Sequence, residues 1–189
     1  MQLIFDNITS TFIATAVIFL LMATNHQAQL TSVETTANYV LHSRVNDFMA
    51  VFMRDMRNVT TVVTPVETDS VFAIRARTDG LGSPERLVEY RRARTGSVSV
   101  NSGTVDQFKI VRSVDGVVTS ESVSTVSNWT IQGQDNSGNI ATTASDVTSI
   151  FVDIEASSPI SIPGVSERDQ PVAQWQSVFK PRLLREAVI

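Results

Sequence analysis

The sequence predicts an α+β protein in which a long, protruding N-terminal helix packs, by its C-terminal half, on an antiparallel β-sheet. Three observations predict this class. Residues 8–62 contain neither glycine nor proline, residues 12–23 are apolar around the whole helix, and the chain after Pro65 alternates apolar and polar side chains between turns. We expect a hydrophobic membrane or assembly helix over residues 1–28, its amphipathic continuation over 29–62, and a β head over 66–189.

The continuous helix is predicted from a stripe of apolar residues. These residues lie three or four positions apart, with a mean of about 3.6, the α-helical period, and they are Leu30, Val33, Ala37, Leu41, Val45, Phe48, Phe52, Met56 and Val59. A helix of about 50 residues would be roughly 75 Å long. Its end is predicted near Val62, where β-branched residues precede Pro65. We expect Phe48, Phe52, Met56 and Val59 to cover the apolar face of the sheet.

The first part of this helix has three interpretations: a signal peptide, a membrane anchor or an assembly helix. No lysine or arginine precedes Phe12, which argues against a signal peptide. The segment from Leu3 to Ala23 has 21 residues, close to the ~20 needed to span a bilayer. We therefore expect a retained helix. Its assembly surface would consist of Asp6, Phe12, Ile13, Ala16, Val17, Phe19, Leu20 and Leu21.

The remainder of the chain predicts an antiparallel meander of about six to eight strands. The expected strands cover residues 70–77, 86–94, 97–100, 107–114, 117–123, 126–131, 147–154 and 174–180. Hairpins are predicted at Thr95-Gly96 and at Asn101-Ser102-Gly103. Asp115-Gly116 is the strongest turn signal, because a type I′ turn favours this dipeptide.

Composition excludes several kinds of chemistry. There is no cysteine, so disulfides, thiolate metal sites and cysteine nucleophiles are excluded. The net charge of −4 argues against nucleic acid as a partner. His26 and His42 both fall on the predicted helix, where a solvated or interfacial histidine is favoured over a ligand. Because no hydrolase, metalloprotease or phosphate-binding motif occurs, we expect no enzymatic activity, no catalytic residue, no cofactor and no metal.

Two surface features allow a functional and a structural interpretation. The Asp135–Asn139 loop has side-chain oxygens that would suit calcium, but it lacks the further acidic ligands of a full site, so a simple turn is favoured. A cluster of arginines on two neighbouring predicted strands would give either a positive surface or cross-strand ion pairs with Asp79, Glu85 and Glu89, and we favour the pairs. These arginines are Arg75, Arg77, Arg86, Arg91, Arg92 and Arg94.

Five phrases in the predicted strands carry a resemblance to a known family. They cover residues 87–91, 110–116, 126–131, 150–154 and 175–179. With the protruding helix, they resemble the type IV pilin and pseudopilin superfamily, and most closely the J-type minor pseudopilins of type II secretion systems. The resemblance implies a structural subunit that assembles through its N-terminal helix into a pilus, a pseudopilus or the tip of such a filament.

Asp6 is the only carboxylate in the apolar segment. Members of the resembled family usually carry a short basic leader ending in glycine, and a glutamate at the fifth mature position, and this sequence shows neither. Asp6 is close to that position but not on it. If the chain begins at a processed N-terminus, the resemblance implies that Asp6 would neutralise the α-ammonium group of a neighbouring subunit in an apolar filament core. The alternative is that Asp6 lies at the polar membrane edge, where the helix dipole favours a negative charge. The residues alone leave these two interpretations open.

The sequence thus leads to one main functional expectation. The chain would reside in the inner membrane as a single-pass protein and then join a periplasmic or extracellular filament. Its partners would be copies of itself or other pilin-like subunits. A second hypothesis is a membrane-anchored β-domain that binds an extracytoplasmic partner. A third, an enzyme that uses carboxylates alone, is weaker because nothing in the sequence locates a pair of them.

Overall fold

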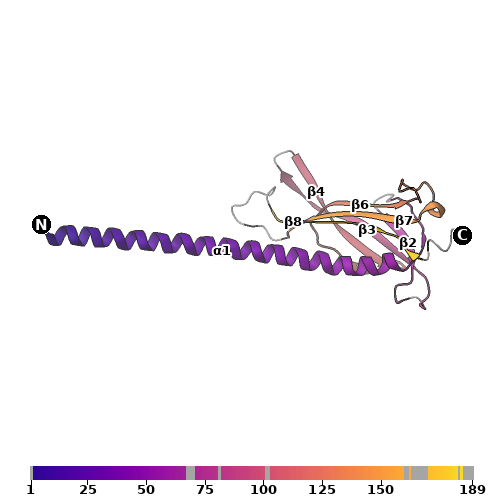
Figure 1. The fold of residues 1–189 in the computed structure, drawn as a ribbon, viewed down its shortest axis with the longest axis horizontal. Helices are drawn as coiled ribbons and strands as arrows, with labels where there is room; N and C mark the ends of the chain where they lie inside the picture. Colours follow the sequence, from indigo (N-terminus) through magenta and orange to yellow (C-terminus); the bar gives the residue numbers. More distant parts are fainter. Residues whose placement is uncertain are drawn as a thin grey trace.

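A computed structural model of the protein describes residues 2–66, 71–80, 82–100, 103–159, 162, 170–182 and 184, with side chains from residue 7 onward except at 98–100. The helix α1, Gln2–Arg57, has 56 residues and is followed by a sheet of eight antiparallel strands. The expected α+β class is confirmed. The N-terminal part of α1 extends far beyond the sheet as a single straight rod (Figure 1).

The helix ends earlier than the sequence predicts. It stops at Arg57, where the amide of Asn58 donates to the carbonyl of Asp55 at 3.0 Å, and β1 begins at once as Val59–Val62. Val59 pairs with Ala76 of the next strand, β2 (Val71–Ala76), so it is a strand residue and not the last member of the helical stripe. The run Val59-Thr60-Thr61-Val62 is β-branched throughout, which favours a strand once a partner is available.

The sheet follows the chain almost strand by strand. Its strands are β1, β2 (Val71–Ala76), β3 (Arg86–Val100), β4 (Gly103–Val114), β5 (Val117–Glu121), β6 (Val126–Gln134), β7 (Ser149–Ser157) and β8 (Val172–Phe179). The order across the sheet is β1-β2-β3-β4-β6-β7-β8, with β5 paired to β4. β5 pairs with the C-terminal end of β4, and β6 pairs with β4 only at Phe108↔Val126. The two outer strands of the sheet are β1 and β8.

The predicted turns have different outcomes. Asp115 and Gly116 have φ of 51° and 82° and connect the pair Val114↔Val117, which confirms the type I′ hairpin. The hairpin predicted at Thr95-Gly96 is wrong, because β3 runs on to Val100 and only its register with β4 shifts between Arg94 and Gly96. β3 and β4 pair as far as Val100↔Gly103, while residues 101 and 102 of the other predicted hairpin lie outside the described residues.

The core lies between the C-terminal half of α1 and one face of the sheet. Leu41, Phe48, Phe52 and Met56 of the helix belong to one buried apolar cluster that also contains residues from every strand except β5. Phe52 is at its centre, with its ring edge-on to four aromatic rings of the sheet at centroid distances of 4.9 to 6.3 Å. These rings belong to Tyr90, Trp129, Trp175 and Phe179. Such contacts are favourable beyond the apolar area that they bury.

Candidate functional site

The feature that most needs a functional explanation is the exposed apolar rod at the N-terminal end of α1. Phe12 is 76% exposed, Phe19 74% and Leu20 66%, and the other members of the predicted assembly surface in the described part, Ile13, Ala16, Val17 and Leu21, are exposed as well. Asp6 lies within α1, but its side chain is outside the described residues. Large apolar side chains gathered on one surface mark a site for a membrane or for other proteins.

The rod carries no charge over a long distance. Between Asp6 and Glu34 the sequence has no aspartate, glutamate, lysine or arginine. The hydroxyls of Thr11 and Thr15 donate at 2.8 Å to the carbonyls four residues earlier, as Thr24 does at 3.0 Å. Their polar atoms are therefore satisfied within the helix. By length and composition, α1 could cross a membrane, and none of this apolar stretch is buried in the protein itself.

A polar segment, in which Glu34 is the one charged residue, separates the rod from the head. The side chains of residues 24–36 are exposed except for Leu30 and Val33, which are half-buried, and Ala37 is the first fully buried residue of α1. Thr31 and Thr35 again donate to carbonyls within the helix. The predicted histidines His26 and His42 are both exposed. The apolar stripe of the sequence is therefore fully buried only from Ala37 onward, and it joins the buried core cluster from Leu41.

The docked end of α1 contains a buried polar cluster that sequence reasoning missed. Asp55 of α1 is fully buried and lies opposite Arg112 of β4 and Tyr90 of β3. Arg112 binds its carboxylate in two places, from Nε to Oδ2 at 2.6 Å and from Nη2 to Oδ1 at 3.1 Å. The Tyr90 hydroxyl donates to the same Oδ2 at 2.6 Å. We call Asp55, Tyr90 and Arg112 the helix clamp.

The surroundings of the helix clamp fix its protonation. Burial, followed by the charge of Asp55 and the hydrogen bond to it, raises the pKa of Tyr90 well above its ordinary value. Burial alone would lower the pKa of Arg112, but the hydrogen bonds and charge of Asp55 raise it overall. A further nitrogen of the guanidinium donates to Thr119 of β5. The phenol of Tyr90 therefore stays neutral and the guanidinium of Arg112 stays charged. The ion pair joins α1 to β4, and the hydrogen bonds of Tyr90 and Thr119 extend this contact to β3 and β5.

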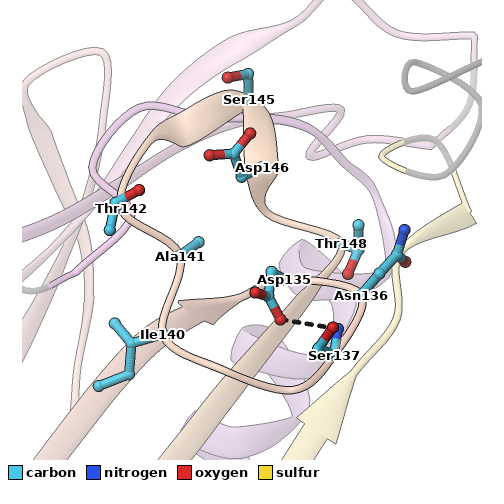
Figure 2. Close-up of a pocket in the computed structure, with 9 residues that line it drawn as sticks. All are labelled: Asp135, Asn136, Ser137, Ile140, Ala141, Thr142, Ser145, Asp146 and Thr148. Atoms are coloured by element: carbon cyan, nitrogen blue, oxygen red, sulfur yellow. Dashed lines mark hydrogen bonds between the residues drawn. The ribbon is translucent and has the colours of Figure 1, made fainter.

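The Asp135 loop is a hydrogen-bonded turn at one end of the sheet. One carboxylate oxygen of Asp135 accepts from the amide of Ser137 at 2.8 Å (Figure 2). The same oxygen accepts from the amide of Asn139 at 2.9 Å. Gly138 has φ of 84°. Asp135 and Asp146 line one pocket beside this loop, and the Thr143 hydroxyl donates to the carboxylate of Asp146 at 2.7 Å. Within the described residues no three His, Asp or Glu side chains come together as metal ligands. The hydrogen bonds that Asp135 accepts are those of a turn.

Four of the six arginines predicted to cluster have local partners of their own. Arg94 binds Asp106 across the β3–β4 hairpin at 2.7 Å, and Arg86 lies 3.8 Å from Asp115. Arg77 lies 3.9 Å from Glu85, and the guanidinium of Arg92 lies 4.6 Å from the centre of the Phe108 ring. Exposed ion pairs of this kind contribute little to stability. They do, however, distribute the positive charge among acidic neighbours, which is not the arrangement of an anion-binding patch.

No family model, no curated protein and no solved structure matches the chain. A functional conclusion therefore rests on the molecule itself. Its two parts differ in burial: the β head has a buried core, and the described side chains of the apolar rod are exposed.

Proposed function

We propose that the chain is a non-enzymatic, pilin-like structural subunit. The N-terminal part of α1 holds it in a membrane, and the same surface then packs against α1 of copies of itself or of related subunits to build a filament or its tip. The observation that carries the proposal is the uncharged apolar rod, which projects from a β head and exposes Phe12, Phe19 and Leu20. Side chains of this kind are unstable in water and require lipid or protein around them.

The driving force for assembly depends on whether the rod is surrounded by water or by lipid before it packs against other helices. Transfer of a large apolar side chain from water is worth roughly 1.5 to 3 kcal/mol, but little of this remains if the rod leaves lipid. Close packing of helices then dominates, and small side chains permit it. Ala14, Ala16 and Ala23 provide such positions on the rod. The β head would cover the outside of the filament. The subunit would be held in the inner membrane by α1 before assembly, and the filament would lie in the periplasm or outside the cell.

The alternative function is a tethered β-domain that binds an extracytoplasmic partner. It is favoured by one observation, that a single apolar helix near the N-terminus is sufficient for anchoring. A tether, however, needs no straight helix that runs without glycine or proline from the apolar end into the core of the head. A continuous rod fixes the position of the head relative to the apolar end, which a filament requires and a tether does not.

Removal of detergent from the purified full-length protein, followed by negative-stain microscopy, tests the proposal. We expect filaments or short ladders from the parent chain and none from Leu20→Arg, because a charge in the packed helices has no partner. Thr104→Arg adds the same charge at an exposed position on β4 and should assemble like the parent. Normal filaments from Leu20→Arg, or none from the parent chain, would refute the proposal in favour of the tether.

A further inference from the structure

The last strand of the sheet has one edge without a strand partner. β8 pairs with β7 along its whole length, from Ile150↔Phe179 to Ser157↔Val172. β8 is also the end of the strand order, and within the described part of the chain no strand pairs with its other edge. Among the residues that the structure describes, this edge is therefore open to a strand from another chain. An unpaired edge of this length is a template for strand addition.

β8 lacks the features by which proteins usually protect an edge strand. Lysine, other charges, proline, bulges and very short strands all discourage pairing with a second chain. Val172–Phe179 has eight residues and contains no charged residue and no proline, and its pairing with β7 is regular throughout. Val172 and Val178 are both about half exposed. The opposite edge strand, β1, has only four residues.

The sequence of β8 indicates which chain would pair with it. Residues 172–178 read Val-Ala-Gln-Trp-Gln-Ser-Val, which is almost the same in both directions about Trp175. When two copies of such a strand lie antiparallel with their centres aligned, each side chain meets its equivalent or a close relative. Valine then faces valine, glutamine faces glutamine, alanine faces serine, and Trp175 faces Trp175. Like-sized apolar and amide pairs stabilise neighbouring strands.

We propose that β8 is a self-association edge, which pairs antiparallel with β8 of a second copy of this chain about a two-fold axis at Trp175. The pairing extends one sheet across both subunits, in the manner of an isologous dimer. The side chains needed for it are accessible: Gln174 and Gln176 are exposed, and Trp175, Ser177 and Phe179 on the helix side are only half-buried. Trp175 is also held in place, stacked on Phe179 with 5.7 Å between ring centres.

This contact is different from the packing of α1 in the proposed filament. β7 and α1 run roughly along the long axis of the molecule (Figure 1), and β8 pairs with β7 along its whole length. Two subunits with antiparallel β8 strands therefore point their rods in opposite directions. Neighbours in one polar filament cannot have this relationship, so the β8 contact joins subunits of two filaments or of two facing membranes. The inference goes beyond the proposed function and stands independently of it.

Because the chain has no cysteine, disulfide cross-linking provides a direct test in full-length protein in detergent. The aligned pairing places residue 174 opposite residue 176 of the other copy, within the Cα separation of about 4.4 to 6.8 Å that a disulfide requires. Gln174→Cys mixed with Gln176→Cys should give a dimer of twice the 20.7 kDa chain after oxidation. Either variant alone should give much less, since its two cysteines lie diagonally apart. No dimer in the mixture, or equal yields from single variants, overturns the proposal.

A charge test examines the same register without a covalent bond. Gln174→Lys with Gln176→Lys places like charges opposite each other across the two-fold axis, and the self-association seen in sedimentation should be lost. Gln174→Lys with Gln176→Glu changes the same exposed positions but places opposite charges together, so that the dimer should be retained. Equal behaviour of the two double variants contradicts the pairing.

Leu20→Arg separates this proposal from the proposed function. It removes the surface by which α1 would assemble but leaves β8 unchanged, so cross-linking between the 174 and 176 positions should continue in that background. Loss of the cross-link with Leu20→Arg would mean that the contact depends on helix assembly, and the independent β8 dimer would then be wrong.

Discussion

The Nε atom of Arg112 lies 2.6 Å from Oδ2 of Asp55, and both side chains are almost completely shielded from water. This ion pair is the one charged link in the described contact between α1 and the core of the sheet. A buried pair with good geometry costs desolvation that its attraction only partly offsets, but removal of one partner leaves an uncompensated charge. The helix clamp is therefore a place where single and combined substitutions should behave differently.

The first prediction concerns the charges of the helix clamp. Arg112→Met should reduce the free energy of unfolding by about 3 to 5 kcal/mol, because the buried carboxylate of Asp55 loses its cation. The triple variant Asp55→Leu, Tyr90→Phe, Arg112→Met removes every charge and should recover most of that loss. Urea unfolding followed by circular dichroism measures both. A triple variant less stable than Arg112→Met would contradict this explanation. It would show that the polar contacts of the helix clamp themselves stabilise the packing of α1 on the sheet.

The second prediction concerns alkaline pH. Tyr90 has a raised pKa when folded, whereas in the unfolded chain it ionises near pH 10. Below that pH both states keep the phenol proton. Above it the unfolded state releases a proton that the folded state retains, so stability falls as pH rises. Tyr90→Phe should be less stable at neutral pH by about 1.5 to 3 kcal/mol, through loss of a hydrogen bond to a charged group.

The difference in free energy of unfolding between the parent and Tyr90→Phe isolates the contribution of this tyrosine from that of the other titrating groups. This difference should become smaller as pH increases from 9 to 11. Urea midpoints at several pH values give the comparison. A difference in free energy of unfolding that stays constant over this range would mean that Tyr90 ionises as readily in the folded protein as in the unfolded chain. Tyr39→Phe is the matched control, because Tyr39 is exposed on α1 and should change nothing.

The third prediction compares two phenylalanines of the same helix. Phe52 is fully buried among four aromatic rings, and Phe19 is 74% exposed on the rod. Phe52→Ala should destabilise the head by about 3 to 5 kcal/mol through lost burial and a cavity. Phe19→Ala should leave the unfolding of the head in detergent unchanged. Equal effects of the two variants would mean that the rod and the head do not behave as separate parts.

The sequence predicts the helix and most strands because their signals are local. The absence of glycine and proline before Pro65 and the regular apolar stripe determine the rod, and Asp115-Gly116 determines its hairpin. The errors concern places where pairing overrides local preference. Val59–Val62 becomes a strand because it pairs with β2. β3 continues through Thr95 and Gly96 because β4 pairs with it on both sides of these residues. A turn dipeptide does not end a strand that has a long partner.

The helix clamp was missed, although the sequence holds a signal for it. Asp55 lies three residues after Phe52, on the apolar side of the helix, and Arg112 alternates with Ile110 and Val114 on one face of a strand. Each is a charge at a position where the pattern requires an apolar residue. Two such exceptions of opposite sign predict a buried pair. That the two meet depends on the packing of α1 against β4, which sequence periodicity does not give.

The fourth prediction concerns Gly133 of β6, where the backbone is packed too closely for a side chain. A Cβ there would lie 2.5 Å from Cγ2 of Val147 and 3.0 Å from the carbonyl oxygen of Pro65, to which the Gly133 amide donates. Gly133→Ala should therefore cost about 1 to 3 kcal/mol in urea unfolding, as overpacking does. The conformation does not demand glycine, because Gly133 is not among the residues with positive φ. The cost should therefore come from contact alone.

A second substitution tests that explanation. Val147→Ala removes the nearest methyl groups, and in its background Gly133→Ala should cost less than in the parent. The double variant should therefore lose less free energy of unfolding than the two single variants together. Recovery should be incomplete, because the Pro65 carbonyl is backbone and must still shift. Additive effects would place the strain elsewhere. The segment around Pro65 would then be the part that yields, and its bridge from Val66 to Gln132 should weaken in hydrogen exchange.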